Sequence, residues 1–94
     1  MYLHLGDEFV IPTHDLIGIF DLDAVTSSSL GRRYLQNAEK QGRLHTVGEN
    51  IPKSFIVCGK FREESVYLSP ISAATLLKRI SRGSISGADV VSEV

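Results

Sequence analysis

Lysine and arginine residues gather on two stretches of helical period, residues 30–43 and 70–82. At about 100° per residue, the bases of each stretch fall on one side and apolar residues on the other. Each phosphate that a base neutralises releases counterions, so several bases on one surface would bind a nucleic-acid backbone with salt-sensitive affinity. The candidate DNA-binding residues on the two helices are Arg32, Arg33, Lys40, Arg43, Lys78, Arg79 and Arg82.

The same pattern fits an ordinary solvated helix surface, because surface helices are normally rich in Lys and Arg. The basic side of the first helix includes one acid, Glu39, and that of the second includes none. Phosphate contacts position a protein without specifying a sequence, and no obvious set of base-reading residues accompanies them. Both interpretations stay open for either helix.

The nucleophilic and metal-ligating residues lack the spacing that catalysis or metal binding requires. The three histidines and the single cysteine, Cys58, form no pair with metal-ligand spacing. His14 and Asp15 are adjacent, but no nucleophile accompanies them. The serines at 27–29 fit a helix cap better than a nucleophile. We therefore predict no enzyme, no metal, no cofactor and no small-molecule substrate.

Alternating and apolar runs predict the strands that must position these residues. The Gly6-Asp7 step predicts a hairpin turn between the first two strands, and Gly18 predicts a bulge within the third. Residues 12–15 fit a loop or a single helical turn. The predicted strands cover residues 2–5, 8–11, 16–22, 43–47, 54–58 and 65–68.

Capping residues set the limits of the two helices. One of the serines at 27–29 caps the first helix, and Gly42 ends it. Ser69 and Pro70 take the N-cap and first helical positions of the second, which Gly83 ends. The residues predicted to face the core are Leu30, Tyr34, Leu35 and Ala38 on the first helix and Ala73, Leu76, Leu77 and Ile80 on the second.

This order of elements predicts an α+β fold with a small, mostly antiparallel sheet and two helices. At 94 residues the chain makes one domain. We predict that this domain covers residues 1–83 and that the aperiodic residues 84–94 form a flexible C-terminal tail.

Charge and composition favour assembly or a polyanionic partner. Residues 1–23 sum to −5, and residues 24–82 sum to +6. The core must be small and aliphatic, because the chain has no Trp, and its mean hydropathy of +0.04 is high; both favour a homo-oligomer. The lone thiol and the lack of a basic leader or long apolar run predict a cytoplasmic protein without a membrane partner.

Four segments in fixed order, YLHLGDEFVIPTHDLIGIFDLD, KSFIVCGK, VYLSPIS and TLLKRI, resemble the Rem family of bacterial extracellular matrix regulatory proteins, and most closely its RemB type. The resemblance covers roughly residues 1–82 and implies a cytoplasmic, DNA-binding regulator of biofilm matrix genes. It further implies a ring of identical subunits with a fold similar to LytTR-type DNA-binding domains.

In the RemA type, the resemblance implies DNA contacts from an arginine in the early loop and from an Arg-rich turn before the third strand. This chain has His14 at the first place, and only Lys53 is basic in the turn at residues 50–53. Lys53 is therefore the first candidate phosphate contact. The alternative is an oligomeric scaffold or partner protein of the same fold that has lost DNA binding. In that case the acidic residues 1–23 of one subunit dock on the basic side of the next.

Overall fold

The computed structural model describes residues 1–60 and 63–83. The predicted tail at 84–94 and the tip of the charged turn at 61–62 lie outside the described residues. The elements in chain order are β1 (Tyr2–Gly6), β2 (Phe9–Pro12), the 3-10 helix η1 (Thr13–Asp15), β3 (Leu16–Asp21), α1 (Leu22–Thr26), α2 (Ser29–Lys40), β4 (Leu44–Thr46), β5 (Ser54–Lys60), β6 (Glu63–Ser69) and α3 (Ala73–Gly83).

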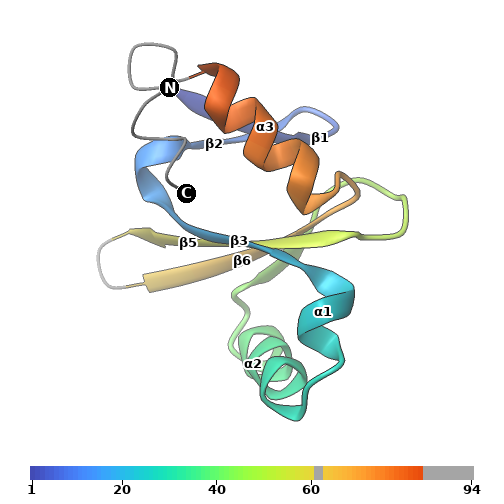
Figure 1. Ribbon diagram of the computed structural model, residues 1–94. Helices are drawn as coiled ribbons and strands as arrows, with labels where there is room; N and C mark the ends of the chain where they lie inside the picture. Colours follow the sequence, from blue (N-terminus) through green and yellow to red (C-terminus); the bar gives the residue numbers. More distant parts are fainter. Residues whose placement is uncertain (61–62, 84–94) are drawn as a thin grey trace.

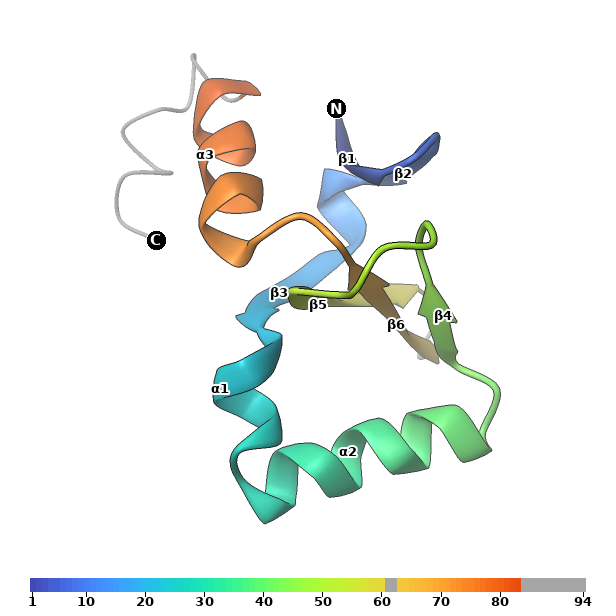
Figure 2. The same ribbon diagram turned by 90° about the vertical axis from the view of Figure 1, so that its right-hand side faces the viewer.

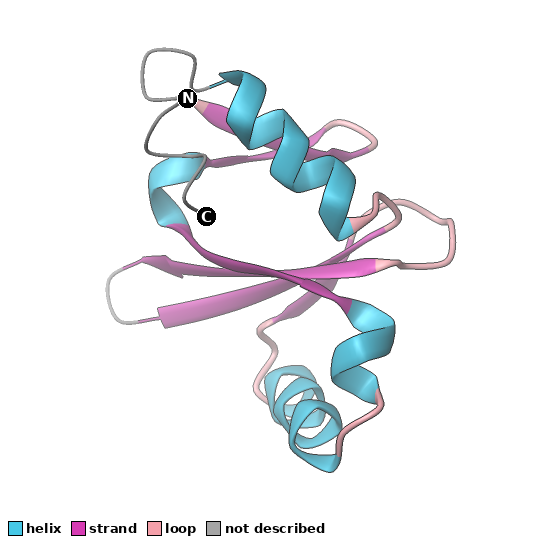
Figure 3. Ribbon diagram, in the orientation of Figure 1, coloured by secondary structure: helices cyan, strands magenta, loops and turns pink. Residues whose placement is uncertain are grey.

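A four-stranded sheet of order β3-β5-β6-β4 forms the middle layer. The β1–β2 hairpin and α3 cover one face, and α1 and α2 cover the other (Figures 1 and 2). Two cores result. One contains Leu5, Ile56 and Leu76, and the other contains Ala38 and Val66, all of them fully buried. The predicted α+β class is confirmed (Figure 3).

Local sequence explains the two irregular places that were predicted. Gly6 at φ 128° and Asp7 at φ 53° turn the chain between β1 and β2, which confirms the hairpin. In the β3–β5 pair, Leu16 lies opposite Cys58 and Gly18 opposite Val57. Ile17 is thus the extra residue of a bulge, at the place where Gly18 predicted one.

All six predicted strands are present and their pairing is mostly antiparallel, as predicted, but they form two sheets rather than one. The β1–β2 hairpin forms a separate two-stranded sheet. In addition, β4 pairs with β6 in parallel, while β3, β5 and β6 are antiparallel. The parallel pair arises because α2 carries the chain across the sheet between β3 and β4.

The structure has a third helix, α1, that the sequence did not predict. The carboxylate of Asp21 accepts hydrogen bonds from the backbone N–H of Asp23 at 2.9 Å and of Ala24 at 3.4 Å. This cap ends β3 one residue earlier than predicted, because Leu22 already belongs to the helix.

The prediction that Leu30 faces the core is wrong, because its side chain is 75% exposed. Helix α2 approaches α1 through Gly31, where an added Cβ would lie 2.1 Å from the carbonyl oxygen of Val25. This close approach fixes the rotation of α2 and leaves Leu30 outside. The predicted cap from the serines and the stop at Gly42 are confirmed, since Ser28 caps the helix and Gly42 has φ 73°.

Ser69 and Pro70 do not begin the second predicted helix. Ser69 is the last residue of β6, and its buried hydroxyl donates to the carbonyl of Leu5 and accepts from the N–H of Ile71 at 3.0 Å. Instead, the hydroxyl of Ser72 accepts from the N–H of Thr75 at 3.2 Å at the start of α3. Tertiary bonding thus takes Ser69 away from its predicted role.

We predict that Ser69→Ala lowers the free energy of unfolding by about 1–3 kcal/mol, because the buried carbonyl of Leu5 and the half-buried N–H of Ile71 lose a partner. Urea denaturation measures the change. Ser65→Ala, in the same strand and with no hydroxyl bond to a described residue, is the control and should change stability by less than about 0.5 kcal/mol. Equal small losses in both variants would show that Ser69 does not hold the hairpin on the sheet.

Candidate nucleic-acid interface

The outward side of α2 carries a polar stripe of four residues. Arg33, Gln36, Asn37 and Lys40 follow the spacing i, i+3, i+4 and i+7, and all four are exposed. None of their side chains bonds a described residue. The opposite side of the helix packs on the sheet through Ala38 and its neighbours. The stripe is therefore held on a fixed helix with its polar groups turned to solvent.

Sequence reasoning identified Arg33 and Lys40 but missed Gln36 and Asn37. Their signal was present, because the two amides stand between the two bases at helical spacing. Gln and Asn pair bidentately with adenine in the major groove, while Arg and Lys contact phosphates or guanine. The stripe thus combines both kinds of side chain on one surface.

Tyr34 and Glu64 join the stripe's helix to the sheet. The tyrosine hydroxyl donates to Oε1 of Glu64 over 3.1 Å. Burial, followed by this bond, raises the pKa of Tyr34 above its usual value, so the hydroxyl stays a donor at neutral pH.

Three of the predicted DNA-binding arginines bond the protein's own backbone. Arg32 donates to the carbonyl of Thr26 at 2.7 Å, and Arg79 donates to that of His4 at 3.1 Å. Arg43 donates to the carbonyl of Glu64 at 3.1 Å and also bonds the Gln41 side chain at 2.6 Å. A guanidinium has five N–H donors, so these residues keep some for other partners, but each has a structural role.

The two basic helices lie on opposite faces of the central sheet (Figures 1 and 2). Lys78 and Arg79 on α3 are therefore separated from Arg33 and Lys40 on α2 by a full layer of the protein. The side chain of Arg82 lies outside the described part. The basic sides of the two helices of one chain therefore cannot contact the same stretch of a DNA duplex.

Lys53 lies in the connection before β5, where its N–H donates to the carbonyl of Ser69 at 2.8 Å and its carbonyl accepts from the N–H of Leu22 at 3.0 Å. It lines the same surface hollow as Asp21 and Asp23. These two carboxylates lower the local attraction for phosphate. The backbone bonds of Lys53 therefore hold it in a fixed position, but its electrostatic attraction for a phosphate is weak.

His14 occupies the far end of the β3–β5 pair from Lys53. It is followed by β3, whose first residue pairs with Cys58 and whose last pairs with Ser54. At about 3.3 Å per residue, the strand between them spans about 17 Å. His14 and Lys53, the two positions that the family resemblance indicated, therefore do not form one contact site in a single chain.

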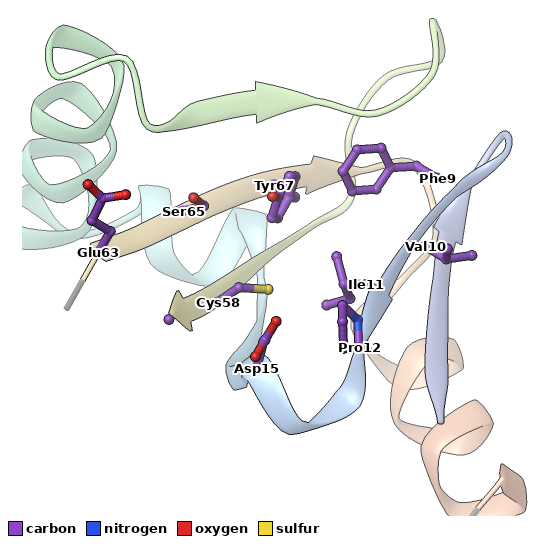
Figure 4. Close-up of a pocket in the computed structure, with 10 residues that line it drawn as sticks. Phe9, Val10, Ile11, Pro12, Asp15, Cys58, Glu63, Ser65 and Tyr67 are labelled. Carbon is purple, nitrogen blue, oxygen red and sulfur yellow. The ribbon is translucent and has the colours of Figure 1, made fainter. Parts of the chain in front are cut away.

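A second hollow of about 330 Å³ lies beside the hairpin (Figure 4). The ring centroids of Phe9 and Tyr67 are 4.9 Å apart with the ring planes tilted by 47°, and Asp15 points toward the sulfur of Cys58. Burial, and secondarily the charge of Asp15, raises the pKa of the Cys58 thiol to about 11. The thiol stays protonated at neutral pH and is a poor nucleophile.

Among the described residues, no three His, Cys, Asp or Glu side chains are grouped so that they could hold a metal ion. In the same part of the chain, no helix has the length and apolar character needed to cross a membrane.

Comparison with known proteins shows the family of this chain. Residues 2–80 match the model of the RemA-like family, described as extracellular matrix regulatory protein A-like. The chain belongs to this family. It is also 38% identical over 82 residues to extracellular matrix regulatory protein B of Bacillus subtilis strain 168, which covers 84% of this chain and 89% of that relative. The predicted resemblance to the Rem family is confirmed, and this relative is of the B type that the sequence indicated.

The raised pKa of Cys58 predicts a pH-dependent loss of stability. The thiol of the unfolded chain ionises near 9.0, but the folded one ionises only near 11. The free energy of unfolding should therefore be unaffected below pH 9 and should fall between these values by up to about 1.4 kcal/mol per pH unit. Denaturant titrations from pH 7 to 11 measure this, and Cys58→Ala should give a shallower fall. Identical slopes would contradict the assignment.

Proposed function

We propose that this chain is a homo-oligomeric, ring-forming, cytoplasmic DNA-binding regulator of extracellular matrix genes. The observation that carries the DNA-binding part is the outward stripe of α2. It presents two bases and two amides that no described residue engages. Bases position a protein on the phosphate backbone, and amides read base edges. The family supplies the regulatory role.

Self-assembly supports DNA binding in this proposal, because one α2 contributes few phosphate contacts. Several copies held in a fixed relation would engage one duplex together, and linked contacts raise the overall affinity without new residues. A chain of 10.3 kDa that leaves several large apolar side chains exposed, including Ile51 at 85% and Ile17 at 61%, favours such an assembly.

Another function, an oligomeric scaffold that has lost DNA binding, has its own support. Arg32, Arg43 and Arg79 serve the fold as donors to backbone carbonyls. Lys53 adjoins Asp21 and Asp23. Both observations reduce the positive charge available to a nucleic acid.

For DNA binding, we predict that Arg33→Ala with Lys40→Ala weakens binding about equally for unrelated duplexes. The slope of log K against log salt should flatten by roughly two units, at about 0.9 per phosphate contact. Gln36→Ala with Asn37→Ala should keep the slope and reduce discrimination between duplexes. Fluorescence anisotropy titrations at several salt concentrations measure both effects.

Lys53→Ala and Arg79→Ala are the comparison variants, and each should change the slope by less than one unit. A larger effect from Lys53 than from the double α2 variant would move the surface to the loop before β5. If the wild type does not bind DNA at low salt, the scaffold function would replace the DNA-binding function.

For assembly, light scattering at micromolar concentration should give a mass several times that of the 10.3 kDa chain. The physical reason is the apolar surface that a single copy leaves in water. A monomeric mass would contradict the proposed oligomer independently of any result with DNA.

A further inference from the structure

Strand β3 is an edge of the central sheet, and with α3 it encloses an apolar groove of about 250 Å³. Ile17 and Ile19 line it from the strand, and Leu77 and Ile80 line it from the helix. Ile17 is 61% exposed because the bulge turns it outward, and Leu77 is 41% exposed. A cavity of about 150 Å³ already accommodates benzene, so this groove has room for an aliphatic side chain.

Ile51 projects at the other end of the same edge. It is 85% exposed, the most exposed of the large apolar side chains in the described part of the chain. It adjoins Asp21 at the end of β3 and Ala73 at the start of α3. The groove instead lies against the first half of β3 and the later turns of α3. The connection that carries Ile51 therefore lies beyond one end of the groove (Figure 1).

We propose that Ile51 of one copy inserts into the β3–α3 groove of the next copy. This inference rests on the proposed self-assembly and names the surfaces that carry it. A projection and a groove at two different places on one chain make a head-to-tail contact, which closes into a ring if the rotation allows.

Charge complementarity supports a second copy of this chain as the occupant. Asp21 and Asp23, both exposed, flank Ile51 together with Lys53, so the charges beside the projection sum to −1. Lys78 follows Leu77 on the exposed side of α3 and bonds no described residue. The head-to-tail contact brings these acids toward Lys78. If the groove of one copy met the groove of another, the Lys78 side chains of the two copies would approach and repel each other.

This arrangement places Lys78 at the contact between subunits rather than on DNA. It also leaves α2 uncovered, because α2 lies on the opposite face of the sheet from α3 (Figure 2).

Two variants that each damage one half of the contact test the proposal. Ile51→Asp loses the projection, and Ile17→Asp loses the groove. Since both residues are exposed, the fold should survive, which circular dichroism and thermal melting check. Each variant alone should associate at least about 10-fold more weakly than the wild type.

Mixing the two variants gives the decisive result. Ile17→Asp still has its projection, and Ile51→Asp still has its groove, so one good contact remains per pair. Native mass spectrometry with one variant isotopically labelled should show a dimer with one copy of each and nothing larger. Leu30→Asp, which changes an equally conspicuous side chain at 75% exposure on α2, should keep the wild-type mass.

Folded variants that both keep the wild-type mass would overturn the proposed contact while leaving self-assembly intact, whereas a monomeric wild type would overturn self-assembly itself. The proposed contact would also be overturned if both variants associate more weakly than the wild type but their mixture forms no mixed dimer. An unchanged mass for Ile17→Asp, with a changed mass when residues 84–94 are removed, would assign the groove to the chain's own C-terminal segment and reject the second copy.

Discussion

The burial of β5 on both faces is the constraint on which the rest of the structure depends. Consecutive residues of a strand point to opposite sides, so Phe55 and Val57 enter one core while Ile56 and Cys58 enter the other. An apolar strand of this kind needs a covering layer on each face. The chain supplies α1 and α2 on one face and the hairpin with α3 on the other. This requirement separates the two basic helices before any partner is considered.

Positive charge in this protein serves two purposes that the fold distinguishes. One purpose is to donate hydrogen bonds to carbonyl groups of the protein's own backbone, each of which is an acceptor. Arg32, Arg43 and Arg79 donate such bonds at three places. Among the described bases without such a role, Arg33 and Lys40 share a side of α2 with two amides, Lys78 stands on α3, and Lys53 lies in the connection before β5. The charge that can act on a partner is therefore smaller and more localised than the composition implies.

In the proposed assembly, the surface for DNA and the surface for neighbouring subunits lie on different layers. The β3–α3 edge joins copies, and α2 on the other face stays accessible. A ring built this way repeats one modest basic stripe at regular intervals. The repetition turns weak phosphate contacts into a multivalent surface. Both parts require the same sheet, because the sheet holds α2 and α3 in a fixed relation.

The sequence alone determined the features that depend on neighbouring residues. The six strands, the turn at Gly6, the bulge at Gly18 and the stop at Gly42 follow from local backbone preferences and side-chain alternation. The family, too, was evident from ordered local motifs. The polar stripe of α2 was also accessible, since it needs only helical spacing.

Only the tertiary structure decided which residues meet across the chain. Ser69 has the sequence context of a cap, yet the carbonyl of Leu5, distant in sequence, engages its hydroxyl. Leu30 has the period of a core residue, yet the close approach of Gly31 to Val25 sets the helix rotation that exposes it. The parallel β4–β6 pair and the separation of the two basic helices also depend on how the layers pack. Such outcomes minimise the free energy of the whole fold, and a local pattern holds no information about a partner that folding brings from elsewhere.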